Sequence, residues 1–432
     1  MGNKNLYIRT YGCQMNFHDS ERMIGILRDE GYNLTDNPDE ADLIIFNTCS
    51  IREKAEQKFY SDLGRLRKLK KTNPGLKIGV GGCIAQQEGK RIFGRVPYVN
   101  LVLGPQNIES LPDLIGTEKS TSLEDRPDNS KTYIHPHRLD RIKAWVTIMY
   151  GCDNFCSYCV VPYTRGRERA RPWKDIHREV KGLSEAGYKE ITLLGQNVNS
   201  YGSGLEDGMD FTDLLYKIHS MDGIKRIRFI TSHPKDLSKK LVRAMKELSK
   251  VCEHIHLPLQ SGSDSVLYLM KRVYTYSDYK EKIELLRAEI PGIAITSDII
   301  TGFPGESEED FEKTVKALKE INYDGIFAFK YSKRPNTSAV KLPYHMPDEV
   351  KAERLTRVLD IQDEITLRKN KELIGKEVGV LVEGKSKIGE DKMTGRTRTN
   401  KIVNFSGKTD LIGQEIKLRI IEARHHSLEG EI

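Results

Sequence analysis

The sequence has no apolar run that approaches the length of a membrane span. Its first residues, MGNKNLYIRTYGC, lack the charged head, apolar core and cleavage site of a secretion signal. We therefore expect a cytoplasmic protein with no membrane partner. Cysteine is scarce, and its odd count of seven favours metal or catalytic use over a disulfide framework. The net charge of +7, from 69 Lys and Arg against 62 Asp and Glu, only mildly favours a polyanionic partner.

The chain is long enough for two or three domains, and its 38% hydrophobic and 30% charged residues are an ordinary globular balance. Up to residue 116, apolar runs alternate with amphipathic stretches in the order β-α-β-α-β, which predicts a parallel sheet covered by helices. A further strand is expected at VNLVL, residues 99–103. Residues 117–140 are rich in Ser, Asp, Pro and Thr without apolar periodicity, so we interpret them as a linker.

A second β/α series begins at residue 141 and has six strand candidates: AWVTIMY, EITLLG, RIRFIT, HIHLPL, IAITSDIIT and GIFAFKYS. Six such repeats predict an incomplete β/α barrel, whose active groups gather at the carboxyl ends of its strands. The last segment has short runs rich in Val, Ile, Thr and Gly, as in a small β-barrel. The predicted class is thus α/β, with domains at residues 1–116, 141–368 and 369–432.

Three cysteines of the first domain lie just past the carboxyl ends of predicted strands: Cys13 after LYIRT, Cys49 after LIIFNT and Cys83 after KIGVGG. The carboxyl ends of parallel strands share one edge of a sheet, so we expect these thiols to converge where α/β sheets bind ligands. Burial as a small hydrophobe is the usual fate of one cysteine, and we expect it for Cys252, but it explains three equivalent positions poorly.

The other three cysteines, Cys152, Cys156 and Cys159, follow the first barrel strand with the spacing C-x3-C-x2-C. A structural zinc site needs four ligands, and the bacterial ferredoxin run has a different spacing, so the pattern matches neither. Three thiolates leave one position of a metal centre open.

The spacing C-x3-C-x2-C after the first strand of a six-repeat barrel resembles the cysteine signature of the radical S-adenosylmethionine enzymes. The order of the three domains resembles that of the methylthiotransferases over essentially the whole chain. The stretches TYGCQMNFHDSE, NTCSIREKAEQK, GCDNFCSYCVVPYTRGRERARP and GRTRTNKIVNF are similar to the branch that modifies dimethylallyladenosine beside the anticodon of tRNA. The resemblance implies two 4Fe-4S clusters. One would be an auxiliary cluster on Cys13, Cys49 and Cys83, and the other would bind S-adenosylmethionine on Cys152, Cys156 and Cys159. The terminal barrel would be an RNA-binding TRAM domain.

Methylthiolation replaces a C–H bond on an adenine carbon that is neither acidic nor electrophilic, which polar acid–base groups cannot do. The resemblance implies that S-adenosylmethionine supplies a 5′-deoxyadenosyl radical and that the protein supplies position and exclusion of water. It also implies that sulfur is delivered at the auxiliary cluster, so the two cysteine edges should face each other across the substrate. The expected partners are tRNA, a reductant protein and a sulfur donor.

Contacts to the cofactor and to RNA are expected at polar positions near the ends of strands. In radical enzymes, turns such as LLGQNVNSYG, PLQSGS and TGFPGE hold the methionine and ribose groups, although turn geometry alone also explains such residues. The alternating arginines of TRGRERARP could contact RNA phosphates or acidic cofactor groups, or could lie in a solvated loop. Cations beside an aromatic residue in the terminal barrel are typical of RNA binding. The cofactor candidates are Gly195, Gln196, Gln260, Ser261 and Glu306, and the RNA candidates are Arg396, Arg398, Lys401 and Phe405.

Two other functions stay open at this point. Sister enzymes act on threonylcarbamoyladenosine in tRNA or on an aspartate of a ribosomal protein. A protein of another class, an iron-sulfur electron carrier or an RNA-binding module with structural metal, would not cleave S-adenosylmethionine.

Overall fold

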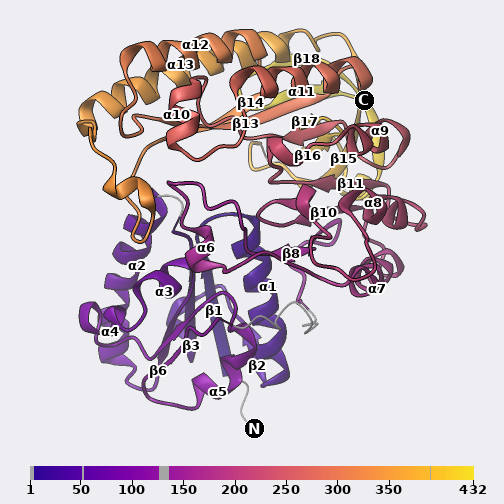
Figure 1. The fold of residues 1–432 in the computed structure, drawn as a ribbon. Coiled ribbons are helices and arrows are strands. Elements are labelled where there is room, and N and C mark those ends of the chain that lie inside the picture. Colours follow the sequence, from indigo (N-terminus) through magenta and orange to yellow (C-terminus); the bar gives the residue numbers. More distant parts are fainter. Residues whose placement is uncertain (1–3, 51–52, 126–135, 390) are drawn as a thin grey trace.

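A computed structural model describes residues 4–50, 53–125, 136–389 and 391–432. Figure 1 shows an N-terminal α/β domain in indigo and purple below a larger β/α domain, with the yellow terminal strands packed beside that larger domain.

The N-terminal domain is a six-stranded parallel sheet in the order β2-β1-β3-β4-β5-β6. Alternate side chains of β3 enter two cores: Ile44 and Phe46 pack on one face of the sheet, and Leu43 and Ile45 pack on the other. The strands are β1 Lys4–Thr10, β2 Tyr32–Leu34, β3 Leu43–Thr48, β4 Lys77–Gly82, β5 Leu101–Leu103 and β6 Ser120–Ser122. The helices are α1 Gln14–Asp29, α2 Glu53–Thr72, α3 Cys83–Glu88, α4 Arg91–Arg95 and α5 Leu111–Ile115.

The predicted strands and helices of this domain are present, including the strand within VNLVL. The interpretation of residues 117–140 as a linker is wrong for β6, which pairs with β5 as the last strand of the sheet. Its sequence, STS, has no apolar side chain because an edge strand can be held by backbone hydrogen bonds alone. Residues 126–135 of the proposed linker lie outside the described residues, and the other domain limits stay predictions.

The second domain contains the six predicted parallel strands as two three-stranded sheets, β11-β10-β7 and β12-β13-β14. A parallel bridge between Ile227 and Val251 joins them, and in the described part of the chain no ladder closes β7 on β14. The strands are β7 Lys143–Thr147, β10 Glu190–Leu194, β11 Arg226–Phe229, β12 His254–His256, β13 Ala294–Thr301 and β14 Gly325–Lys330. The helices around them are α7 Trp173–Glu185, α8 Phe211–His219, α9 Lys239–Glu247, α11 Tyr276–Glu289, α12 Glu308–Ile321 and α13 Asp348–Lys371.

Four short elements stand at the open end of this incomplete barrel. They are β8 Met149–Tyr150, α6 Val161–Thr164, β9 Arg169–Ala170 and α10 Asp264–Leu269. The antiparallel pair of β8 and β9 closes the base of the loop that carries Cys152, Cys156 and Cys159.

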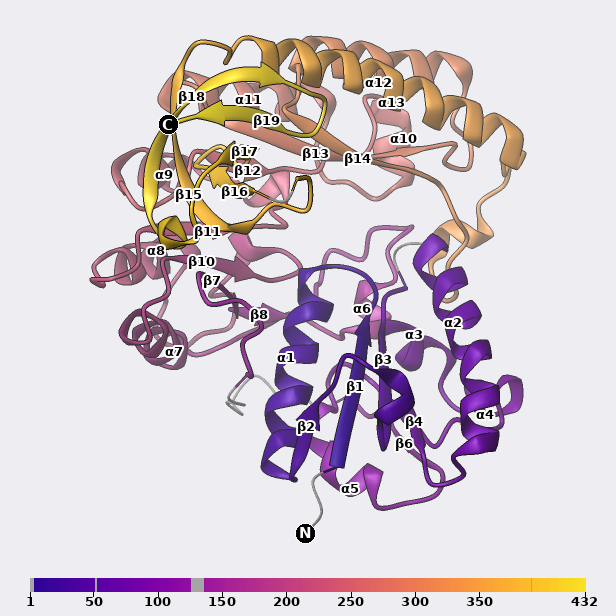
Figure 2. The ribbon, with the colours of Figure 1, turned by 180° about the vertical axis from the view of Figure 1, so that it is seen from behind.

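The terminal domain is a small β-barrel, as the sequence predicts, and the structure shows it closed by five strands in the order β15-β16-β17-β19-β18. Its strands are β15 Glu377–Lys385, β16 Lys392–Thr397, β17 Ile402–Ser406, β18 Glu415–Ala423 and β19 Leu428–Glu431. Buried charge fixes it to the central domain: the fully buried Arg226 of β11 pairs with Glu415, at 2.6 Å between Nη2 and Oε1. Figure 2 shows these strands lying over the region of β10, β11 and β12.

Candidate metal centres

The three N-terminal cysteines, which we name the auxiliary trio, lie at one edge of the sheet. Cys49 and Cys83 come directly after β3 and β4, Cys13 comes three residues after β1, and these three strands are parallel neighbours. Gly12 has a positive φ of 121°, and a Cβ there would lie 2.3 Å from Cβ of Cys49. Only glycine allows the two cysteine segments to approach so closely.

The thiols of the auxiliary trio influence one another and share one cation. A hydrogen bond with the Cys49 side chain lowers the pKa of Cys13, and the Arg165 guanidinium lowers it further. Burial raises the pKa of Cys83, while Arg165, which hydrogen-bonds this thiol, opposes the rise. Arg165 is itself buried, and its Nη2 lies 2.7 Å from Oδ2 of Asp19 on α1. The edge therefore joins three sulfur donors to one fixed positive charge.

The second set, which we name the loop trio, is Cys152, Cys156 and Cys159. Gly151 precedes it with a φ of 73°, and a Cβ there would lie 2.0 Å from the carbonyl oxygen of Arg167. The Cys152 backbone N–H closes the loop by donating to Gly166, at 3.2 Å. Burial, reinforced by the nearby Cys156, raises the pKa of Cys159 to about 12.

One buried arginine also stands beside the loop trio. Nη1 of Arg272 donates to Sγ of Cys156 at 3.4 Å, and its other donors reach the Tyr274 hydroxyl at 2.8 Å and the Pro258 carbonyl at 3.0 Å. These bonds hold the cation in place, so it offsets negative charge at the sulfur atoms.

Both sets offer the thiolate donors that iron-sulfur clusters require. In residues 4–50, 53–125, 136–389 and 391–432, no three Cys, His, Asp or Glu side chains already stand in metal-holding geometry. The thiols are gathered but not closed around an ion. The donor chemistry fits two clusters, each with a buried arginine at its side, and ligation by these six cysteines stays a prediction.

The five cofactor candidates divide into two groups. Gln196 accepts from the Gly151 N–H at 2.5 Å. Among the described residues, its buried Nε2 and the buried Oε1 of Gln260 have no hydrogen-bond partner. Ser261 hydrogen-bonds Thr314 at 3.2 Å, and Glu306 accepts from the Phe303 N–H and pairs with Arg354. A Cβ at Gly195 would meet Met149. Gly195, Ser261 and Glu306 thus have contacts within the protein that account for them, and cofactor binding by all five residues stays a prediction.

Sequence reasoning missed several polar groups at the same end of the barrel. Asn197, Ser232, His233 and Tyr331 follow strands β10, β11 and β14, and each has a buried polar atom without a hydrogen-bond partner in the structure. Burying such atoms costs free energy unless a ligand or water satisfies them. Together with Gln196 and Gln260 they outline a site for a polar molecule beside the loop trio. In the sequence, the polar segment TSHP just after β11, which contains Ser232 and His233, could have indicated part of this site.

The arginines of TRGRERARP have a role that neither interpretation from the sequence included. Arg165 pairs with Asp19, Arg171 with Glu179 and Arg169 with Asp125, and only Arg167 is well exposed, paired with Asp153. All four therefore pair with carboxylates of the protein, and the pairs of Arg165 and Arg171 are buried.

This network continues through Arg138, which joins Glu21 of α1 at 2.9 Å to Glu179 of α7 at 2.6 Å. A second link runs from His18 of α1 to Thr147 of β7, at 2.9 Å between Nδ1 and Oγ1. The N-terminal domain is thus fixed against the barrel by buried polar contacts.

The structure corrects the RNA candidates of the terminal barrel. Phe405 is wrong as a stacking residue, because its ring is fully buried in the barrel core. Arg398 binds Glu253 at 2.7 Å, Arg396 pairs with Glu383 at 3.3 Å, and Lys401 donates to Asn370 at 2.8 Å. Arg398 and Lys401 thus join the terminal barrel to the central domain, the Arg396 pair lies within the barrel, and contact of these cations with RNA stays a prediction.

The sequence matches three known families in the order of the three domains. Residues 5–104 match Uncharacterized protein family UPF0004, residues 146–318 the Radical SAM superfamily and residues 371–432 the TRAM domain. A tRNA-2-methylthio-N(6)-dimethylallyladenosine synthase of Thermodesulfovibrio yellowstonii is 55% identical over 100% of this chain and 99% of its own length. The chain belongs to this synthase family.

Other members of the synthase family are similar over almost their full length. The synthase of Syntrophus aciditrophicus is 51% identical, covering 99% of this chain and 94% of its own. The synthase of Clostridium beijerinckii is 49% identical, covering 99% of this chain and 96% of its own.

Solved structures support the fold alone, because their identity to this chain is low. The radical S-adenosylmethionine methyltransferase TsrM from Kitasatospora setae covers 90% of this chain and 79% of its own, at 13% identity and a TM-score of 0.59. The cobalamin-dependent radical enzyme OxsB covers 83% of this chain and 56% of its own, with a TM-score of 0.51.

Among the described residues, no helix has both the length and the apolar character needed to cross a bilayer.

Proposed function

We propose that this chain converts N6-dimethylallyladenosine beside the anticodon of tRNA to 2-methylthio-N6-dimethylallyladenosine, with two 4Fe-4S clusters and S-adenosylmethionine as cofactors. Its relatives in the synthase family carry this activity in their names. The observation that carries the proposal is the pair of cysteine trios at strand ends of two docked domains, each with a buried arginine beside its thiols.

The chain's own residues prepare these centres before chemistry begins. The two trios would hold the clusters, and the loop trio would hold the one whose chemistry, when bound, is one-electron reduction of S-adenosylmethionine. Arg165 and Arg272 offset negative charge at the sulfur atoms. Gln196, Gln260 and the neighbouring unpartnered groups would bind the polar parts of S-adenosylmethionine.

The domain interface suits a reaction that needs both centres. Arg165 follows the loop trio by six residues, yet it pairs with Asp19 of α1 and approaches Cys83 of the auxiliary trio. The same short segment therefore links the two sites. A substrate adenine held between them would be reached from both sides while the packed domains exclude water.

The remaining partners follow from the proposed reaction. A reductant protein would supply electrons, a sulfur donor would renew the sulfur that is used, and the tRNA substrate would place the enzyme in the cytoplasm. Protein reconstituted without oxygen should contain about eight iron atoms per chain, four for each trio. A single tightly bound zinc ion would contradict both cluster assignments.

The function is tested by nucleoside analysis of tRNA from cells with and without the gene. We expect the 2-methylthio nucleoside to disappear and N6-dimethylallyladenosine to accumulate when the gene is deleted. Unchanged tRNA nucleosides would refute the proposal, and a lost modification on a ribosomal-protein aspartate would identify the sister activity instead.

A further inference from the structure

An open hollow lies between the N-terminal domain and the barrel, away from the residues already assigned. It has a volume of about 480 Å³. An ion pair between Arg334 and Glu56, at 3.1 Å, joins its two sides. Figures 1 and 2 both show the loop after β14 beside the end of α2. The hollow is lined by Glu56, Gln57 and Tyr60 of α2, Arg95 of α4, and Ser332, Lys333 and Arg334 of the loop that follows β14.

A stacked pair of side chains forms one wall. The Arg95 guanidinium lies 3.6 Å from the centre of the Tyr60 ring, and Arg95 is exposed to solvent. Tyr60 in turn packs against the buried Phe59, at 4.6 Å between ring centres. A planar cation fixed over an aromatic ring is a surface on which a nucleic-acid base stacks.

The charge of the hollow favours an anion. Glu56 is paired with Arg334, whereas the exposed Lys333 makes no ion pair with any residue that the structure describes. Arg95 and Lys333 therefore add two positive charges to the walls. Phosphate groups of a nucleic-acid backbone are the common ligands of such side chains.

The hollow is also connected to both cysteine trios. The loop after β14 continues to Ala339, whose N–H donates to the carbonyl of Ser157 within the loop trio, at 2.8 Å. On the other wall, α2 begins four residues after Cys49 of the auxiliary trio. Both walls of the hollow are therefore continuous with segments that contact or carry a cysteine trio.

We infer that this hollow binds the substrate RNA strand next to the modified nucleotide, with one base stacked on the Arg95–Tyr60 pair and phosphates held by Arg95 and Lys333. The inference rests on the proposed function and extends it, because it assigns RNA contacts outside the terminal barrel.

The test measures binding of tRNA that carries dimethylallyladenosine to the reconstituted protein, by fluorescence anisotropy over a series of salt concentrations. The double variant Arg95→Gln with Lys333→Gln should bind about tenfold more weakly. Its slope of log affinity against log salt should be shallower by roughly 1.4, since each lost single-strand phosphate contact removes about 0.7. Lys333→Gln alone, at an exposed and unpaired site, should remove about 0.7.

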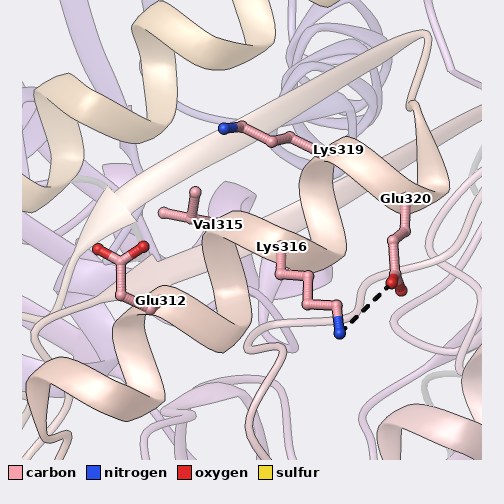
Figure 3. Close-up of a pocket in the computed structure, with 5 residues that line it drawn as sticks. All are labelled: Glu312, Val315, Lys316, Lys319 and Glu320. Atoms are coloured by element: carbon pink, nitrogen blue, oxygen red, sulfur yellow. Dashed lines mark ion pairs between the residues drawn. The ribbon is translucent and has the colours of Figure 1, made fainter.

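A matched control changes two lysines on the outer helix α12. Figure 3 shows Lys316 and Lys319 in a shallow depression formed by this helix, where Lys316 pairs with Glu320 at 3.8 Å. The double variant Lys316→Gln with Lys319→Gln has the same change of charge and should bind tRNA like the unaltered protein. Arg95→Lys with Lys333→Arg should keep the salt slope while losing part of the stacking.

The outcomes separate this inference from the proposed function. If the unaltered protein does not bind the tRNA, the proposed function fails. If it binds and the hollow variants match the α12 control, RNA binding in the hollow is refuted while the proposed function stands. A hollow that instead captures an acidic peptide would leave the salt slope for tRNA unchanged in the variants, and it would refute the inference in the same way.

Discussion

The two cysteine trios differ in how the chain brings their thiols together. The auxiliary trio takes one residue from each of three strand ends, separated by 36 and 34 positions, whereas the loop trio lies within eight positions of one loop. The first exists only when the parallel sheet is folded in register, and the second needs only its local turn. Iron binding at the auxiliary trio should therefore depend far more on the global fold.

The two trios also differ in the origin of the buried arginine beside each of them. Arg272 serves the loop trio from the same domain, but Arg165 leaves the loop-trio segment and reaches the auxiliary trio. The cation beside the auxiliary trio is therefore supplied by the segment that carries the loop trio. Damage to the domain interface should affect the two centres unequally.

The largest expected effect separates the roles of the trios. Cys156→Ala should reduce formation of 5′-deoxyadenosine from S-adenosylmethionine to the background rate, because on the proposed function the loop trio would hold the cluster that delivers the electron. Cys49→Ala should keep this cleavage and stop methylthiolation. Chromatography of both products from each variant checks this, and equal loss of both activities in the two variants would contradict separate roles.

The next effect concerns the interface. Arg138→Ala removes the ion-pair partner of the buried Glu21 and leaves the buried Glu179 with Arg171 alone, so we expect the free energy of unfolding to fall by about 3 to 5 kcal/mol. Arg178→Ala on the same helix α7 is the control. Its exposed pair with Asp175 should contribute less than about 1 kcal/mol. Denaturant unfolding of the two variants measures the difference, and equal stability losses would show that the buried link is not what fixes the domains.

A smaller effect tests the two cations. Reduction adds negative charge to a cluster, so removal of a buried arginine should lower the reduction potential of the neighbouring cluster. Each tenfold decrease in the equilibrium constant for one-electron reduction corresponds to roughly 60 mV. Arg165→Gln should act on the auxiliary cluster, studied with Cys156→Ala, and Arg272→Gln should act on the other, studied with Cys49→Ala. Spectroscopic redox titration gives both potentials. A shift of the wrong cluster, or no shift, would refute the assignment of one cation to each trio.

The smallest effect compares two thiols of similar exposure. Cys13 and Cys159 are both half-buried, but the pKa of Cys13 is lowered by its hydrogen bond with Cys49, and burial raises that of Cys159 to about 12. In metal-free protein near neutral pH, iodoacetamide should modify Cys13 at least about tenfold faster, since the thiolate is the nucleophile. Raising the pH should accelerate modification of Cys159 and leave that of Cys13 nearly constant. Mass spectrometry of peptides over a pH series measures both rates, and parallel pH profiles would contradict the difference.

The sequence predicted the features that local patterns encode. Strand and helix periodicity was strong enough to give three domains, and the position of each cysteine after a strand was visible in its own segment. Strand β6 was missed because an edge strand of STS carries no apolar signal.

Long-range pairing explains the other errors. Phe405 was predicted to stack on RNA, but the closed barrel places it inside. The arginines of TRGRERARP were expected to contact RNA phosphates or acidic cofactor groups or to lie in a solvated loop, but α1 and α7 supply carboxylates for Arg165 and Arg171. The unpartnered groups of Ser232 and His233 become visible only when the strand ends come together.

The most direct test of the account is incubation of reduced, cluster-loaded protein with S-adenosylmethionine and tRNA that carries N6-dimethylallyladenosine, followed by mass analysis of the nucleosides. We predict a new 2-methylthio-N6-dimethylallyladenosine peak that is absent without S-adenosylmethionine and absent with Cys49→Ala. Cleavage of S-adenosylmethionine by the intact protein with no change in the tRNA nucleosides would contradict the account.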